Sequence, residues 1–178
     1  RREQIRRNLY RSIRHHMQTD RGKFLSIREV CSILDVDLSK VKLQSGAGPD
    51  DLLTGICAWD FYLLPGSLYA ALPPYANLSP KQALARGAKV LLTDKQEEQY
   101  PCIVVPDVME AFCKLCGTIQ NRAHPRTIAV TGSVGKTTTK DMVKSVCEEA
   151  YKVFCDIENN NMATLVGYLV QRIPSTCN

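Results

Sequence analysis

Long hydrophobic runs are missing from this sequence, and ligands for a metal are few. No apolar stretch among the 178 residues approaches the roughly 20 that a membrane-spanning helix needs, so we expect no membrane span. The chain starts with charged residues that no apolar core segment follows, so it shows no signal-peptide pattern either. Both absences favour a cytoplasmic protein. The composition, with 44% hydrophobic and 23% charged residues, is ordinary for a globular domain.

The sequence also lacks a second cysteine pair that would complete a zinc site. Its Cys-x-x-Cys motif is Cys113-Lys-Leu-Cys116, and none of the three histidines has ligand spacing. The motif lies in a segment with helical periodicity that places Cys116 on an apolar face. Most of the other cysteines also fall at apolar positions, which favours reduced, buried thiols over disulfide bonds.

Positive charge is confined to the start of the chain. Residues 1–23 hold eight Arg or Lys and two acids, while the remainder holds 15 basic and 16 acidic residues within a net charge of +5. Apolar residues recur every four positions here, which predicts a basic amphipathic helix over residues 1–24. Such a helix either binds an anionic partner or packs through its apolar stripe. Tyr10 is the one aromatic residue among residues 1–23, which is too few for base stacking, so we expect no specific nucleic-acid partner.

A glycine-containing turn between an apolar stretch and an amphipathic segment is the most informative feature of the chain. It lies in the run Thr131-Gly-Ser-Val-Gly-Lys-Thr-Thr-Thr139, directly after the apolar residues 128–130. The order of buried strand, tight turn and helix is typical of a loop that holds nucleotide phosphates. Val130 stands where the commonest phosphate-loop pattern has its first glycine, five positions before Gly135.

The residue types in this loop suit a triphosphate and Mg²⁺. Gly132 and Gly135 allow a tight turn that points backbone N–H groups at an anion. Lys136 reaches the outer phosphates and is the predicted catalytic residue, while Thr137 offers its hydroxyl to the metal. The other predicted nucleotide contacts in the loop are Ser133, Val134 and Thr138.

The residues before the loop predict a small amino-terminal α/β domain, because apolar runs alternate with helical periodicities. A capping box of Ser26 and Glu29 predicts the start of one helix, and Pro80 at a first helical position predicts another. The predicted strands and a third predicted helix lie near residues 67–72, 89–93, 102–105 and 107–120. We expect this domain to span residues 25–122 and to end at a linker over 122–126.

The residues after the linker predict the start of a second domain, 126–178, built on a parallel sheet around the phosphate loop. Its expected strands and helices are 127–131, 137–150, 152–155 and 162–173. The two helices have predicted apolar faces, Met142, Val143, Val146, Cys147, Ala150 and Tyr151 in the first and Met162, Leu165, Val166, Leu169, Val170 and Ile173 in the second. Val130 and Val153 are expected on neighbouring parallel strands. Such a sheet needs further βα units, so we expect this P-loop domain to be incomplete.

Three stretches of the chain, in the right order, resemble the Mur ligase family, whose members join an amino acid or dipeptide to a carboxylate using ATP. The phosphate loop has the family's spacing. Leu64-Pro-Gly-Ser-Leu-Tyr-Ala-Ala-Leu72 and the segment 83–92 look like its amino-terminal domain. Glu158-Asn-Asn-Asn-Met-Ala163 looks like the asparagine-rich segment of its ATP domain. The continuation Thr139-Lys-Asp-Met142 is most similar to the subgroup that adds D-alanyl-D-alanine to a muramoyl tripeptide.

The resemblance implies a part of an ATP-dependent amide ligase of peptidoglycan precursor synthesis that acts through an acyl phosphate, with ATP and Mg²⁺ as cofactors. It adds Asn160 and Asn161 to the nucleotide contacts and places a UDP-linked muramoyl peptide against residues 54–72. The chain departs from the family at Trp59-Asp60-Phe61, where an Asp-Ser-Arg or Asp-Ser-Asn usually helps to hold the uracil nucleotide. Ser67 replaces the usual acidic residue after Pro-Gly. We therefore expect weak or absent UDP-sugar binding.

Two other functions stay open at this point. The loop would also suit another P-loop NTPase or kinase, and the whole pattern would suit a Mur-like remnant that keeps the fold without activity. The resemblance implies that the family's magnesium-binding glutamate, modified lysine and third domain would follow Asn178. The chain alone is therefore expected not to catalyse ligation, and the full-length form is expected to be a monomer.

Overall fold

The computed structural model describes residues 24–95, 99–155 and 162–177. The predicted basic helix over residues 1–24 lies outside these ranges, except for Phe24. The described helices are α2 (Ile27–Leu34), η2 (Leu38–Lys40, a 3-10 helix), α3 (Pro80–Ala85), α4 (Val108–Ala123), α5 (Lys136–Cys147) and α6 (Ala163–Val170). The described strands are β1 (Ile56–Cys57), β2 (Leu68–Ala70), β3 (Val90–Thr93) and β4 (Cys102–Val104). None of the described helices is long and apolar enough to cross a membrane.

The four strands form one parallel sheet in the order β1-β2-β3-β4, which confirms the predicted α/β fold. Leu68 of β2 aligns with Ile56 on one side and with Val90 on the other. Parallel strands that are covered on both faces are apolar throughout, and every residue of β1, β2 and β3 is buried. The two-residue strand β1 is too short to produce a period in the sequence, so it was not predicted.

Local capping explains where the helices of this first unit begin. The capping box predicted at α2 is present, with the Ser26 and Glu29 side chains each bonded to the other residue's backbone N–H. Ser79 and Gln82 form a second capping box, with Pro80 at the first position of α3. Asp107 caps α4 through the N–H of Glu110. The predicted apolar face of α4 is confirmed, because its members Val108, Phe112, Leu115, Cys116 and Ile119 are all buried.

The two strands predicted around the phosphate loop are absent from the described residues. Residues 127–131 and 152–155 are irregular, and the side chain of Ile128 is 65% exposed. A strand exists only where another strand satisfies its backbone groups, and the described sheet ends at β1 and β4. The predicted pairing of Val130 with Val153 is therefore wrong for this structure, although both residues line the same hollow.

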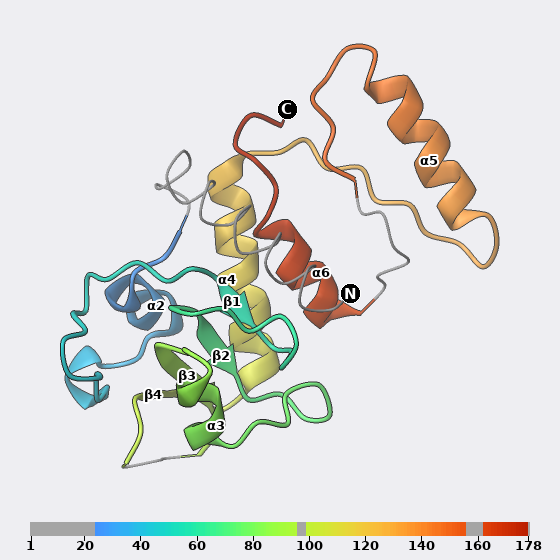
Figure 1. The fold of residues 1–178 in the computed structure, drawn as a ribbon. Coiled ribbons are helices and arrows are strands. Elements are labelled where there is room, and N and C mark those ends of the chain that lie inside the picture. Colours follow the sequence, from blue (N-terminus) through green and yellow to red (C-terminus); the bar gives the residue numbers. More distant parts are fainter. Residues whose placement is uncertain (1–23, 96–98, 156–161, 178) are drawn as a thin grey trace.

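The predicted helix after the loop is present as α5, but its expected apolar face is not covered. Met142 and Val146 are 65% and 73% exposed, and α5 has no buried residue. Figure 1 shows α5 projecting away from the sheet. The amphipathic pattern thus predicted the helix correctly but not a partner for it.

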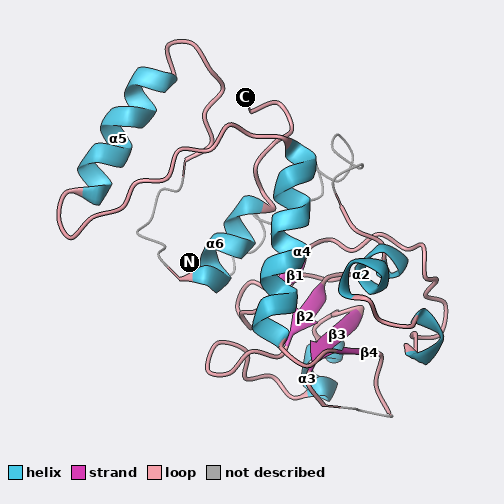
Figure 2. Ribbon diagram, turned by 180° about the vertical axis from the view of Figure 1, so that it is seen from behind, coloured by secondary structure: helices cyan, strands magenta, loops and turns pink. Residues whose placement is uncertain are grey.

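The last helix, α6, packs against α4 of the first unit, on the far side of the expected linker. Figure 2 shows α6 lying alongside α4, with α5 well apart from both. Its most buried face is not the predicted apolar one, because Val166 is 43% exposed, although Val170 of the predicted face packs against the core. The buried residues of this segment are Thr164, Gly167, Tyr168 and Gln171. This face of small and polar residues can be buried because the first unit offers it close contacts and hydrogen bonds in place of apolar packing.

Candidate functional site

The phosphate-loop candidate, residues 132–138, forms a turn that opens directly into α5. Gly132 and Gly135 adopt φ angles of 146° and 77°, values that favour glycine. Gly135 is the N-cap of α5, and no side chain caps this helix end. The first N–H groups of an α-helix have no partner within the helix and carry a partial positive charge. This geometry suits a phosphate group.

Lys136 brings a formal positive charge to the same turn. Its Nζ donates a hydrogen bond to the carbonyl oxygen of Gly132 at 2.6 Å, so the side chain folds back over the loop. The neighbouring residues Ser133, Thr137 and Thr138 are exposed, and Val134 is 89% exposed. All the predicted loop contacts are therefore accessible to a ligand.

The residues present fit magnesium held mainly by a nucleotide rather than by a protein cage. Thr137 offers one exposed hydroxyl, and no cluster of His, Cys, Asp or Glu with metal-binding geometry occurs within the described residues. Mg²⁺ in phosphate-transfer sites commonly takes few protein ligands and keeps waters and phosphate oxygens. The predicted contacts Asn160 and Asn161 lie outside the described residues.

A hollow lies against α5 and is not lined by the loop residues 132–138. It has a volume of about 420 Å³ and is lined by residues from 125–130, from α5 and from 151–155. Ile173 and Cys177 reach its wall from the segment after α6. The predicted nucleotide contacts of residues 132–138 do not line this hollow, so the loop is a surface site in this structure.

The predicted acceptor region is organised around Asp60. Its carboxylate accepts hydrogen bonds from the Tyr69 hydroxyl and from the backbone N–H of Asn77, the latter at 3.1 Å. Burial, together with the hydrogen bond to Asp60, raises the pKa of Tyr69. Asp60 therefore ties the loop after β1 to β2 and is not free to contact a ligand with both oxygens.

The two aromatic residues beside Asp60 have different environments. Trp59 lies with its ring centroid 5.0 Å from that of Tyr75, and its Nε1 donates to the Thr164 hydroxyl of α6 at 3.1 Å. Phe61 is 40% exposed. The Phe61 ring lies with its centroid 4.4 Å from that of Tyr62 and is partly exposed to solvent, whereas the edge of the Trp59 indole is engaged by α6.

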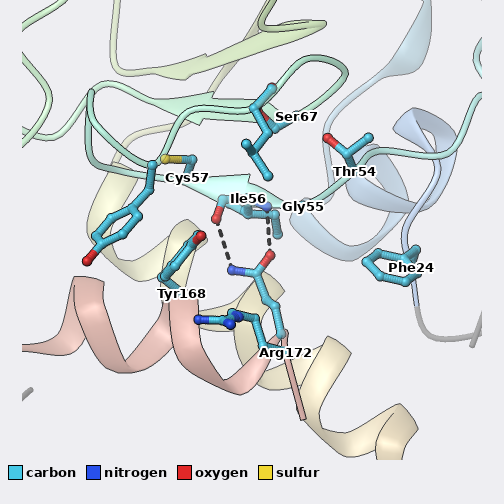
Figure 3. Close-up of a pocket in the computed structure, with 11 residues that line it drawn as sticks. Phe24, Thr54, Gly55, Ile56, Cys57, Ser67, Tyr168 and Arg172 are labelled. Atoms are coloured by element: carbon cyan, nitrogen blue, oxygen red, sulfur yellow. Dashed lines mark hydrogen bonds between the residues drawn. The ribbon is translucent and has the colours of Figure 1, made fainter. Parts of the chain in front are cut away.

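Basic residues reach this region from elsewhere in the chain, although none stands between residues 52 and 72. The Arg86 guanidinium, just after α3, donates to the Asp60 carbonyl at 3.4 Å. Arg172, just after α6, lines a small hollow with Thr54 and Ser67. Figure 3 shows this hollow beneath β1. Spacing along the sequence could not reveal these residues, because both come from other elements.

The eight cysteines are thiols and not disulfides, as the sequence predicted; Cys31, Cys102 and Cys116 are buried, whereas Cys147 and Cys155 are only partly buried. Burial raises the pKa of Cys57 to about 12, and burial also raises the pKa of Cys116. Cys113 is exposed whereas Cys116 is buried, so the Cys-x-x-Cys pair does not present two thiols to one ligand. Cys57 and Cys116 are therefore core residues whose burial disfavours the thiolate.

Known proteins resemble both the sequence and the fold. Residues 130–175 match the Mur ligase middle domain. The UDP-N-acetylmuramoyl-tripeptide--D-alanyl-D-alanine ligase of Escherichia coli (strain K12) is 31% identical over 57% of this chain and 24% of its own length. The UDP-N-acetylmuramoyl-L-alanyl-D-glutamate--2,6-diaminopimelate ligase of Syntrophomonas wolfei is 32% identical over 63% of this chain and 24% of its own length.

The solved structures agree on the fold. A crystal structure of MurF from Acinetobacter baumannii superposes with a TM-score of 0.67 at 19% identity, covering 86% of this chain and 34% of that protein. The resemblance to the Mur ligase family is therefore confirmed by sequence and by fold. The chain spans about a quarter of the length of the two curated ligases and about a third of the solved one.

Proposed function

We propose that this chain provides the nucleotide loop and part of the acceptor domain of a Mur-type ligase that acts in peptidoglycan precursor synthesis in the cytoplasm. The observation that supports this most directly is the turn at Gly132 and Gly135 opening into α5 with Lys136 folded over it. That turn lies within the segment that matches the Mur ligase middle domain.

In this proposal the loop holds ATP. The N–H groups at the start of α5 bind phosphate oxygens, Lys136 neutralises the outer phosphates, and Thr137 contributes to the magnesium site. ATP would supply the phosphoryl group that activates the acceptor carboxylate for amide formation. The exposed Ser133 and Thr138 add hydroxyl contacts from the sides of the loop.

The acceptor would bind against residues 54–72, as in the family. The departures at Trp59-Asp60-Phe61 change the chemistry of that surface, since Asp60 is already engaged with Tyr69 and Asn77. Phe61 and Arg86 offer a ring and a cation there. A UDP-linked muramoyl peptide is the acceptor class we propose, with weak binding to this chain alone.

The direct test is calorimetric titration of the 178-residue chain with Mg-ATP. Lys136→Ala should abolish binding while leaving the circular dichroism and the midpoint of urea unfolding unchanged. The matched control is Lys144→Ala on the same helix, which removes the same charge together with an exposed ion pair to Glu148.

Each result has a defined meaning. Loss of binding in the Lys136 variant alone supports the loop assignment. Equal binding by both variants and the unmodified chain contradicts it. If the unmodified chain binds no nucleotide at millimolar Mg-ATP, the nucleotide function of this chain is wrong and the remnant alternative replaces it.

A further inference from the structure

The contact of α6 with the first unit is the most specific interface that the described residues contain. The Gln171 side chain, just after α6, is buried against β1 at the edge of the sheet. Its Oε1 accepts from the Ile56 N–H at 2.7 Å, and its Nε2 donates to the Ile56 carbonyl at 2.9 Å. The dashed lines at Ile56 in Figure 3 mark this pair. One side-chain amide therefore satisfies the backbone groups that a fifth strand would otherwise pair.

Three further contacts fix the position of α6. The Thr164 hydroxyl accepts from Trp59 Nε1, and the Tyr168 ring stacks on that of Tyr62 with centroids 4.4 Å apart. Gly167 faces α4 so closely that a Cβ there would lie 2.6 Å from Cε1 of Phe112 and 3.1 Å from Sγ of Cys116. The contact thus depends on a missing side chain, because any larger residue at position 167 requires the Phe112 ring or α6 to move.

The same interface also contains two unsatisfied polar atoms. Within the described residues, the Tyr168 hydroxyl and Arg172 Nε are buried without a hydrogen-bond partner. Figure 3 shows both side chains on the α6 side of the hollow beneath β1. Each group gives up its bonds to water when α6 docks, and an unpaired buried polar group is costly. The docked state is therefore stabilised by four contacts and opposed by two uncompensated groups.

The apolar stripe of α6 adds a second reason for reversibility. An amphipathic helix normally buries its apolar stripe, yet here Val166 is exposed and Leu165 and Leu169 are only partly buried. The helix has docked through its polar and small-residue face instead. A helix that docks through the less apolar of its two faces gains less hydrophobic energy from that contact than its apolar face would supply.

We propose that α6 is a detachable latch that covers the β1 edge, Trp59 and Tyr62 of the first unit. Opening of the latch frees the backbone of Ile56, the Trp59 indole and the Cys116 thiol together, because α6 and the Gln171 that follows it contact all three. The surface that α6 covers includes part of residues 54–62 of the acceptor region, so the closed latch would block binding of the acceptor there. That part of the inference rests on the proposed function.

The test compares two glycine substitutions, one at the interface and one away from its contacts. Gly167→Ala favours the helix itself but inserts a methyl group against Phe112, so it should open the latch. Gly117→Ala on α4 is the matched control, since a Cβ there meets no atom within 4 Å. The readout is the rate at which iodoacetamide alkylates Cys116, followed by peptide mass spectrometry in the 178-residue chain.

We expect alkylation of Cys116 to rise about tenfold in Gly167→Ala, equivalent to roughly 1.4 kcal/mol, and to stay unchanged in Gly117→Ala. Cys31, buried in α2, is the internal reference, and its alkylation rate should be the same in the unmodified chain and in both variants. Trp59 is the sole tryptophan, so its emission should move to longer wavelength only when α6 leaves. An unchanged Cys116 rate overturns the latch. Equal acceleration of Cys31 also overturns it, because α6 would then be an inseparable part of the core.

A second arm separates the latch from the proposed acceptor. UDP-N-acetylmuramoyl tripeptide added to the unmodified chain should accelerate Cys116 alkylation, because ligand and α6 would compete for the same surface. If Gly167→Ala opens α6 but the tripeptide neither binds that variant nor changes the rate, the latch is supported and the acceptor assignment fails.

Discussion

At the scale of single residues, Glu29 links three parts of the first unit. Its Oε2 accepts from the backbone N–H of Ser26 at 2.8 Å, which completes the cap of α2. Its Oε1 accepts from the Arg122 guanidinium near the end of α4 at 2.7 Å. Arg122 also donates to the carbonyl of Phe24. The capping box was predictable from four consecutive residues, but the bond to Arg122 spans 93 positions and was not.

The stability of this junction should depend on pH. Burial alone would raise the pKa of Glu29, but the hydrogen bonds from Ser26 and Arg122 outweigh burial and hold the pKa below its ordinary value. A carboxylate whose pKa is lowered by folding stabilises the folded state fully at pH values above its unfolded pKa of about 4.5. This stabilisation disappears as the pH falls through the folded pKa. Acid should therefore destabilise the unmodified chain more than Glu29→Gln.

Urea unfolding at pH 7 and at pH 3 measures this difference. Glutamine keeps the capping box but cannot ionise, so at pH 7 the variant should lose less than about 1 kcal/mol, as is usual for a partly exposed ion pair. At pH 3 the two proteins should approach the same stability. A gap that stays constant between the two pH values would mean that Glu29 acts through packing and not through its charge.

At the scale of elements, the capping residues predicted where helices begin. Strands were harder to predict, because a strand forms only beside another strand. α2, α3 and α4 begin at residues whose side chains cap them, and such caps are contained in a few neighbouring residues. Residues 127–131 have the apolar pattern of a strand but have no strand beside them in the described chain. The face that α6 buries was not predictable, because Gly167 and Gln171 acquire their roles only against Phe112 and Ile56.

The exposed apolar face of α5 gives a prediction at this scale. Met142→Ala combined with Val146→Ala should change the free energy of unfolding by less than about 0.5 kcal/mol, because both side chains are mostly exposed and alanine favours helix. Ile119→Ala in α4 is the contrast, since its buried side chain should cost roughly 2–5 kcal/mol. Urea denaturation of each variant gives both values. A cost above about 2 kcal/mol for the α5 pair would show that this face is packed in solution.

At the scale of the whole molecule, the sequence and the packing place α6 in different units. The resemblance places residues 126–178 in one domain, and residues 130–175 match a single middle-domain family. In the structure, α6 packs with α4, whereas α5 buries no residue. The sequence was thus enough to predict the parallel sheet and its capped helices. The packing of α6 against α4 could be learned only from the tertiary contacts.

Hydrogen exchange can show which grouping governs cooperativity. Amides in well-packed elements exchange only through costly opening, whereas amides in a helix with few buried contacts exchange through cheap local opening. Peptides from α5 should therefore exchange fastest. Peptides from α6 should be protected more than those from α5, but less than those from α4, because α6 opens as a latch while α4 opens only when the core of the first unit unfolds. Saturating Mg-ATP should slow exchange at the start of α5 if the loop binds phosphates. Equal exchange rates for peptides from α6 and α5 would instead show that the boundary at residues 122–126 divides the molecule into two cooperative units.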